Sequence, residues 1–151
     1  MKRFAVIGLG NFGFHAAKAL FEDGNEVVAI DTDKAKVQAI DKYSTEAVVL
    51  EATDKAALQS LGLESMDAVI VSTGTKISTS ILICLYLQEI GVKKILAKAL
   101  DEDHGKILKR VGATEIIHPE RDMALRVSRS LSQPNMLDFI PLADEFDLVQ
   151  V

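Results

Sequence analysis

Short apolar runs alternate along the chain with longer amphipathic stretches. Each run is rich in Val, Ile or Ala and is almost continuously apolar, as a strand is when helices cover both of its faces. This alternation is typical of repeated βαβ units and predicts an α/β fold with a parallel sheet. We expect six strands, at residues 3–8, 26–31, 46–50, 67–72, 94–98 and 115–117.

Helices are predicted between these strands. Six parallel strands joined by right-handed crossovers indicate a Rossmann-like, doubly wound sheet with strand order 3-2-1-4-5-6. Thr53, Asp101 and His118 precede helical stretches and are candidate N-caps. Three glycines stand where a helix should end in a left-handed residue: Gly24, Gly91 and Gly112.

The first strand runs directly into a glycine-rich turn, because residues 4–13 read FAVIGLGNFG. In this GxGxxG pattern Gly8 permits the tight turn, Gly10 lets a pyrophosphate approach the backbone, and Gly13 lets the next helix pack close to the sheet. A phosphate would then bind the free N–H groups at the start of that helix. The turn therefore predicts a nucleotide site, the alternative being a purely structural strand end.

Asp31 strengthens this prediction, since it closes the second apolar run eighteen residues after Gly13. Its carboxylate can accept hydrogen bonds from the ribose hydroxyls of an adenosine, and it would repel a 2′-phosphate, which disfavours NADP. The alternative is that Asp31 is only the N-cap of the following helix.

The ligand of a doubly wound sheet binds at the carboxyl ends of the strands, beside the first strand. Thr32 and Asp33 there contact the ribose or simply start the second helix. Glu51 reaches the adenine or ribose, or faces solvent, and residues 72–74 contact the ligand or form a plain turn. The candidate binding residues after strands one to four are Gly8, Gly10, Asn11, Phe12, Gly13, Asp31, Thr32, Asp33, Glu51, Ala52, Thr53, Ser72, Thr73 and Gly74.

Composition narrows the class of protein. The 151 residues are 48% hydrophobic, but no apolar run approaches the ~20 residues of a membrane span. The first strand begins almost at Met1, which leaves no room for a signal peptide, so we expect a cytoplasmic protein. A net charge of −5 without a basic stripe disfavours nucleic acid as a partner. The single cysteine, Cys84, lies in an apolar stretch and is expected to be a small buried side chain.

The residues for nucleotide chemistry are not evident. His15, His104 and His118 have no nucleophile or metal ligand at motif spacing, and no GxxxxGK[ST] loop is present. No second region is visible that would hold a substrate over a nicotinamide. We therefore expect a domain that binds a nucleotide without transforming it. The alternatives are a small NAD-dependent oxidoreductase or dehydrogenase fragment, and a nucleotide-binding dimerisation module.

The chain after residue 118 departs from a simple Rossmann unit. Pro119 can open a helix, expected over about residues 119–132, with an apolar stripe at Met123, Val127 and Leu131. The stripe packs on its own sheet or on a partner. We assign residues 1–134 to the nucleotide-binding domain and 135–151 to a linker and a terminal strand. That strand would pair with a partner or lead to a further subdomain.

The chain resembles the KTN/RCK (TrkA N-terminal-like) domain family in a series of segments that occur in a fixed order. These are the glycine turn, Asp31, Glu51-Ala52-Thr53, the run from Ala68 to Gly74, Ile95-Leu96-Ala97-Lys98-Ala99 and Ile117-His118-Pro119-Glu120. Such domains regulate Ktr- and Trk-type potassium uptake systems and some ligand-gated potassium channels. The resemblance is strongest to KtrA-type regulatory subunits.

This resemblance implies a cytosolic subunit, peripheral to the inner membrane, that gates a membrane potassium channel subunit by exchange of NAD(H) or ATP/ADP. It implies a homo-oligomer in which dimers build a ring, such as an octamer, with the late helix crossing to a neighbouring protomer.

The resemblance also assigns roles to three further residues. Glu120 would lie near the phosphates and help to hold a divalent cation, or would only be an acid at a helix N-terminus. Lys98 would face the phosphates, or extend its ammonium to solvent from a strand end. ATP-responsive relatives have an arginine where this chain has Asn11, and a neutral amide cannot replace its charge-assisted contact with phosphate. NAD and ADP are therefore at least as well suited as ATP.

Overall fold

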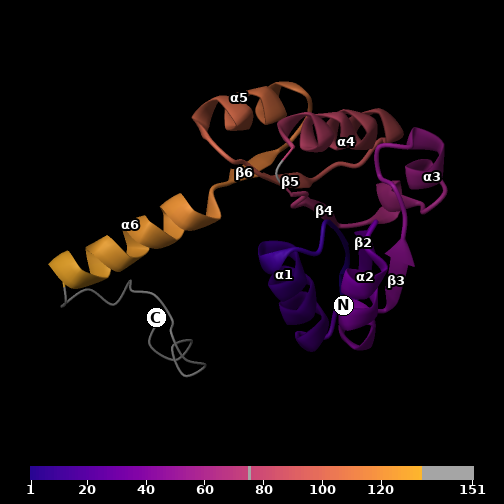
Figure 1. The fold of residues 1–151 in the computed structure, drawn as a ribbon, viewed down its shortest axis with the longest axis horizontal. Helices are drawn as coiled ribbons and strands as arrows, with labels where there is room; N and C mark the ends of the chain where they lie inside the picture. Colours follow the sequence, from indigo (N-terminus) through magenta and orange to yellow (C-terminus); the bar gives the residue numbers. More distant parts are fainter. Residues whose placement is uncertain (75, 134–151) are drawn as a thin grey trace. The chain divides into compact units, whose positions relative to one another are not determined.

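A computed structural model describes residues 1–74 and 76–133 of the protein. Its centre is a six-stranded parallel sheet with strand order β3-β2-β1-β4-β5-β6, so the predicted doubly wound order is confirmed (Figure 1). Every predicted strand is present, with bounds within two residues of those expected. The strands are β1 (Arg3–Ile7), β2 (Glu26–Asp31), β3 (Glu46–Val49), β4 (Ala68–Val71), β5 (Ile95–Lys98) and β6 (Glu115–Ile117).

Helices connect the strands in the alternation that the apolar pattern predicts. They are α1 (Asn11–Glu22), α2 (Lys34–Ile40), α3 (Lys55–Gln59), α4 (Ile77–Ile90), α5 (Glu102–Arg110) and α6 (Pro119–Ser132). Two short 3₁₀ helices, Asp41–Tyr43 and Leu63–Ser65, were not predicted. Within the described residues, no helix is both long enough and apolar enough to span a bilayer.

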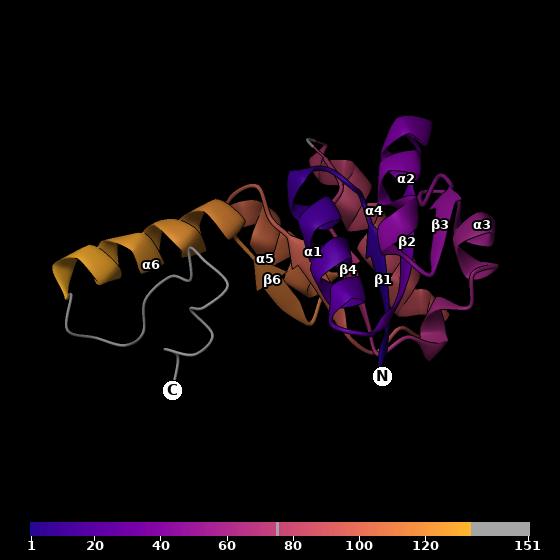
Figure 2. The same cartoon turned by 90° about the horizontal axis from the view of Figure 1, so that it is seen from below.

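Two apolar layers hold the sheet between the helices. Val6, Val27 and Ala29 of the sheet pack with Ala17 of α1 and Ile40 of α2 on one face. The other face packs against α3, α4 and α5, and the helices on the two faces of the sheet can be followed in Figures 1 and 2. Buried residues of that second layer include Ala5, Ile7, Leu58, Val69, Ile83, Cys84, Leu87, Ile95 and Leu108.

Cys84 is fully buried on α4, as expected for a small apolar side chain. Burial raises the pKa of its thiol to about 12.

Helix ends test the predicted caps. Asp101 is confirmed as the N-cap of α5, because its Oδ1 accepts a hydrogen bond from the backbone N–H of His104 at 2.7 Å. Thr53 is wrong as a cap: the N-cap of α3 is Asp54, whose Oδ1 accepts from Ala57 N–H at 3.2 Å. His118 stands at the N-cap of α6 but makes no side-chain cap bond. All three predicted glycines have the positive φ of the left-handed region: Gly24, Gly91 and Gly112.

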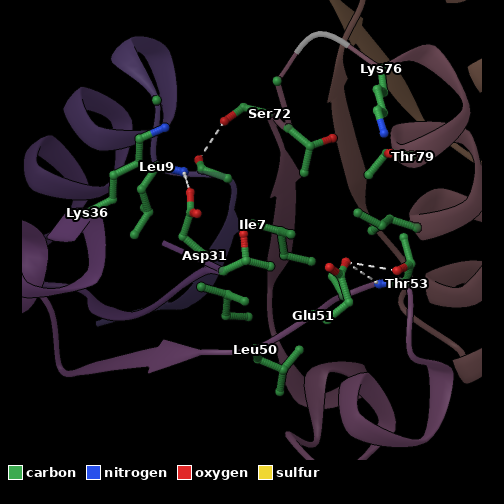
Figure 3. Close-up of a pocket in the computed structure, with 18 of the residues that line it drawn as sticks. Ile7, Leu9, Asp31, Lys36, Leu50, Glu51, Thr53, Ser72, Lys76 and Thr79 are labelled. Atoms are coloured by element: carbon green, nitrogen blue, oxygen red, sulfur yellow. Dashed lines mark hydrogen bonds between the residues drawn. The ribbon is translucent and has the colours of Figure 1, made fainter. Parts of the chain in front are cut away.

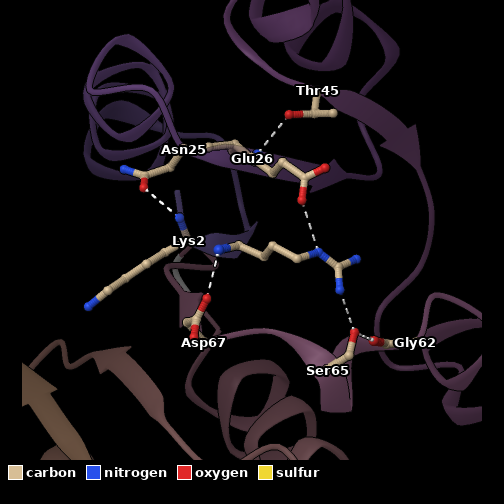
Figure 4. A network of polar contacts seen from close by, with 9 residues as sticks. Lys2, Asn25, Glu26, Thr45, Gly62, Ser65 and Asp67 are labelled. Atoms are coloured by element: carbon tan, nitrogen blue, oxygen red, sulfur yellow. Dashed lines mark hydrogen bonds and ion pairs between the residues drawn. The ribbon is translucent and has the colours of Figure 1, made fainter.

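A polar network fastens the amino ends of the strands, away from their carboxyl ends (Figure 4). Arg3 at the start of β1 donates its backbone N–H to Asp67 at 2.8 Å, and its guanidinium contacts Ser65 and Glu26 at 3.0 and 3.1 Å. Lys2 N–H donates to Asn25 at 3.1 Å. The carboxyl edge of the sheet is thereby left for the loops that form the site.

The chain divides by compactness after Ile117, and α6 belongs to the second unit. Within that unit Asp122 accepts from His118 N–H at 3.3 Å at the start of the helix. No residue of α6 is buried. Met123, Leu125, Val127 and Leu131 are all exposed, so the predicted apolar stripe is present on the helix surface. The predicted linker and terminal strand, residues 135–151, lie outside the described residues.

Candidate functional site

A cavity of about 580 Å³ opens at the carboxyl edge of the sheet, between the loops that follow the strands (Figure 3). These loops converge there because parallel strands present their carboxyl ends to the same edge. Most of the predicted site residues line the cavity: Gly8, Gly10, Asp31, Thr32, Glu51, Ala52, Thr53, Ser72, Thr73, Gly74 and Lys98.

Some predicted residues lie outside the cavity wall. Asn11, Phe12 and Gly13 form the first turn of α1, and Asp33 is the N-cap of α2. Glu120 is exposed in the first turn of α6, in the second unit, and its roles toward phosphate and a cation stay predictions. No cluster of three or more His, Cys, Asp or Glu residues able to hold a metal occurs in the described part of the chain.

Other lining residues were not predicted. Leu50 precedes the predicted Glu51, and Thr79 lies on α4. Lys36 and Lys76 are the important additions. Lys36 is one turn into α2, and Lys76 is the N-cap of α4. Their only signal in the sequence is their closeness to the second and fourth strand ends.

The three glycines of the turn serve different needs. Gly8 has φ +97° and lies so close to β4 that a Cβ would be 2.6 Å from the Ser72 carbonyl oxygen. A Cβ on Gly13 would collide with the carbonyl oxygen of Gly8. Gly10 differs, because no atom would lie within 4 Å of its Cβ. The fold itself requires Gly8 and Gly13, whereas Gly10 leaves open space at the cavity wall.

Gly10 is also the N-cap of α1 and offers no side chain to the N–H groups of the first helical turn. The N–H of Phe14 bonds the Gly10 carbonyl at 2.9 Å, which begins the helical pattern. Earlier N–H groups of a helix have no intrahelical acceptor. An open approach and unused donors are the two features that a phosphate needs at a helix N-terminus.

Asp31 is held by the loops on both of its sides. Its Oδ2 accepts from Leu9 N–H at 2.8 Å, and its Oδ1 accepts from Asp33 N–H at 2.9 Å. The N-cap of α2 is Asp33, which accepts from Ala35 N–H at 2.9 Å, so Asp31 is not the helix cap. A carboxylate has about four acceptor positions. Each Asp31 oxygen thus keeps capacity for a ribose hydroxyl.

The loop after β4 is joined to the glycine turn. Ser72 is buried, and its Oγ donates to the Gly8 carbonyl at 2.8 Å, which gives this predicted ligand contact a structural role. Thr73 follows it with a buried Oγ1 that has no hydrogen-bond partner in the described structure. Buried polar atoms are rarely left unpaired. Thr73 is a lining residue of the cavity, so this unpaired hydroxyl lies next to the position of a ligand.

Glu51 is exposed and turns back on its own loop. Its Oε2 accepts from Thr53 Oγ1 at 2.8 Å and from Thr53 N–H at 3.3 Å. The carboxylate thereby organises the segment after β3 at the cavity wall, with Ala52 buried between the two residues.

Three ammonium groups meet at the cavity in a chain whose net charge is −5. The side chains of Lys36, Lys76 and Lys98 make no ion pair or hydrogen bond with any residue in ranges 1–74 and 76–133. The lining carboxylates already accept hydrogen bonds: Asp31 from Leu9 and Asp33, and Glu51 from Thr53. The free positive charge of the cavity therefore favours an anionic ligand.

The cavity has few groups for catalysis. Its described lining contains no histidine, cysteine or tyrosine. His104 is buried elsewhere, where its Nδ1 accepts from Leu100 N–H at 2.9 Å and its Nε2 lies 2.7 Å from Ser80 Oγ. Both ring nitrogens serve the fold. The arrangement is suited to hold a phosphate-bearing nucleoside.

Comparisons with known proteins agree with this geometry. The TrkA-N domain family matches residues 4–119. The Ktr system potassium uptake protein C of Bacillus subtilis is 46% identical over 150 residues, which cover 99% of this chain and 68% of the relative.

Two solved structures share the fold. The NAD(P)-binding domain of an exopolyphosphatase-related protein from Archaeoglobus fulgidus superposes with a TM-score of 0.77 at 20% identity, covering 88% of this chain and 99% of the other. The GsuK channel bound to NAD superposes with a TM-score of 0.71 at 15% identity, covering 81% of this chain and 22% of the other.

Proposed function

The chain belongs to the TrkA-N domain family, and on that premise we propose that it is the nucleotide-sensing part of a regulatory subunit of a membrane potassium uptake system of the Ktr or Trk type. The observation that carries the proposal is the cavity at the carboxyl edge of the sheet. It combines an open Gly10, an Asp31 with free acceptor capacity and unpaired lysines.

The ligand we propose is an adenine nucleotide, either NAD(H) or ADP/ATP. Asp31 would accept from the ribose hydroxyls, and the phosphates would lie over Gly10 on the N–H groups of α1. The GsuK channel, which shares the fold, is bound to NAD. We also propose that Glu120 helps to hold a divalent cation.

A regulatory role is favoured over an oxidoreductase by the lining of the cavity. A hydride-transfer enzyme needs an acid or base placed for proton transfer. The carboxylates of Asp31 and Glu51 are engaged by backbone N–H groups, and Tyr43 and Tyr86 are not among the lining residues. We therefore propose that the nucleotide is a signal and is not turned over.

The protein partners we propose are further copies of this chain and a membrane-embedded potassium channel subunit at the cytoplasmic face of the membrane. The exposed apolar side chains of α6 at Met123, Leu125, Val127 and Leu131 suit an interface between copies in a dimer-based ring. A nucleotide can bias such a ring only through its different affinities for two ring shapes, typically ~1–3 kcal/mol of coupling.

The test is potassium flux through a Ktr-type channel subunit reconstituted in vesicles with the full protein that contains this chain. Flux is measured with ADP, ATP, NAD and NADH in turn. We expect at least one pair of nucleotides to change the flux several-fold. Asp31→Ala should remove that difference, because every adenosine ligand loses its ribose contact.

The matched control is Glu64→Ala, which removes an exposed carboxylate outside the cavity. It should leave the nucleotide response unchanged. Flux that is the same under all four nucleotides, although the protein binds them, would refute the regulatory role.

A further inference from the structure

The lysines of the cavity come from different sides of the sheet. Lys36 belongs to α2, which follows β2, whereas Lys76 precedes α4, which follows β4. Figure 3 places Lys36 beside Leu9 and Lys76 beside Thr79 on the opposite wall. Because β1 lies between β2 and β4, the glycine turn after β1 lies between these two positions.

The start of the loop after β4 is held against the glycine turn. Ser72, four residues before Lys76, donates to the Gly8 carbonyl at 2.8 Å. A phosphate over Gly10 would have the N–H groups of α1 on one side and the loop after β4 on the other. Lys76 lies on the wall across the cavity from Leu9, which makes its ammonium a candidate for contact with such phosphates.

A lysine is an unfavourable residue at the position of Lys76. It is the N-cap of the fourteen-residue helix α4 and makes no side-chain cap bond. An N-cap is best filled by Asp, Asn, Ser or Thr, which accept from the first N–H groups. A positive charge at a helix N-terminus is also repelled by the helix dipole. The fold gains nothing from this ammonium, but an anion in the cavity would.

Two neighbouring features point to the same ligand. Thr73, on the same loop, has a buried Oγ1 without a partner among the described residues. Lys76 itself has no carboxylate partner there. At the start of α1, beside the cavity, residue 11 is a neutral asparagine. Asn11 thus brings no side-chain charge to the phosphates, whereas the cavity wall itself carries Lys36, Lys76 and Lys98.

We propose that Lys76 is the specificity-determining cation of this site, contacting the nucleotide phosphates from the N-terminus of α4 and making affinity rise with phosphate charge. The inference rests on the proposed function, since it concerns the same nucleotide cavity. It assigns to Lys76 the charge-assisted contact that Asn11 cannot make.

The experiment is calorimetric titration of the full chain with AMP, ADP and ATP at one fixed salt concentration. Lys76→Gln should weaken ADP about tenfold, ATP more than ADP, and AMP least, because the lost attraction grows with ligand charge. Lys76→Arg should keep the wild-type order. Lys34→Gln is the matched control: it removes the same charge from α2 outside the cavity and should leave all three affinities unchanged.

Lys76→Asp separates binding from folding. Aspartate is a strong N-cap and suits the helix dipole, so this variant should melt at a higher temperature than wild type while it binds ATP more weakly than Lys76→Gln does. If Lys76 had only a structural role, replacing it would lower the melting temperature and the nucleotide affinity together.

Three outcomes would overturn the inference. One is that Lys76→Gln binds the three nucleotides as tightly as wild type does. Another is that Lys76→Gln lowers the affinities for AMP, ADP and ATP by the same factor. In both cases the proposed function survives, because the wild-type chain still binds nucleotide. The third, no nucleotide binding by wild type at all, would overturn both proposals.

Discussion

The glycine turn offers a sharp separation between residues that serve the fold and residues that serve a ligand. Gly13→Ala and Gly10→Ala add the same methyl group three residues apart. On Gly13 it collides with the Gly8 carbonyl, which is backbone and cannot swing aside. On Gly10 it enters open space, with no atom within 4 Å.

The magnitudes follow from these surroundings. Overpacking of this kind costs about 3 kcal/mol, and in a chain of this size each kcal/mol lowers Tm by about 2–4 °C. Gly13→Ala should therefore melt about 6–12 °C below wild type, given both estimates. Gly10→Ala exchanges one N-cap for a poorer one, at a cost of less than about 1 kcal/mol.

Ligand binding should respond in the opposite sense. The methyl group of Gly10→Ala occupies the approach of a phosphate to α1, so we expect ADP affinity to fall at least about tenfold, or about 1.4 kcal/mol. Thermal melting with and without ADP measures both effects in one assay. A Gly10→Ala protein that binds ADP as wild type does would refute the placement of the phosphates over this glycine.

Four further predictions concern the fold and the helix surface. Ser72→Ala leaves the buried Gly8 carbonyl without its donor, so unfolding should become easier by about 1–3 kcal/mol, measured by urea denaturation. Burial raises the pKa of Cys84 to about 12, so its thiol should react with a disulfide reagent at pH 8 only on unfolding. The thiol ionises at a lower pH in the unfolded chain than in the folded protein. The free energy of unfolding should therefore fall as pH rises from about 9 toward 12. Val127→Glu changes an exposed side chain of α6, so it should reduce oligomer mass in light scattering, whereas unchanged mass would argue against an interface there.

The fold was largely predictable because its signals are local. Strands covered on both faces must be apolar almost throughout, which placed all six within two residues. The 3₁₀ helices at Asp41–Tyr43 and Leu63–Ser65 have no such periodicity and were missed. The sequence predicts Thr53 as the N-cap of α3, one residue before the actual cap, Asp54. Threonine and aspartate both favour the N-cap position, so the pattern does not distinguish them.

The site was predictable where it follows strand ends and was missed where it depends on helix placement. Asp31 and the glycine turn are set by the ends of β1 and β2. Lys36 and Lys76 reach the cavity only because their helices start close to it, and lysine at such a position ordinarily faces solvent. Ser72 was expected near the ligand, but its hydroxyl bond to Gly8 appears only once β1 and β4 are adjacent in space.

The central claim is that this cavity binds an adenine nucleotide through Asp31 and the glycine turn. Its most direct test is titration of the purified full chain with ADP and NADH, with Asp31→Ala beside wild type. We predict saturable binding at one site per chain, competition between the two ligands, and weakening of both by Asp31→Ala. Absence of saturable binding by wild type, or equal binding by Asp31→Ala, would contradict the account.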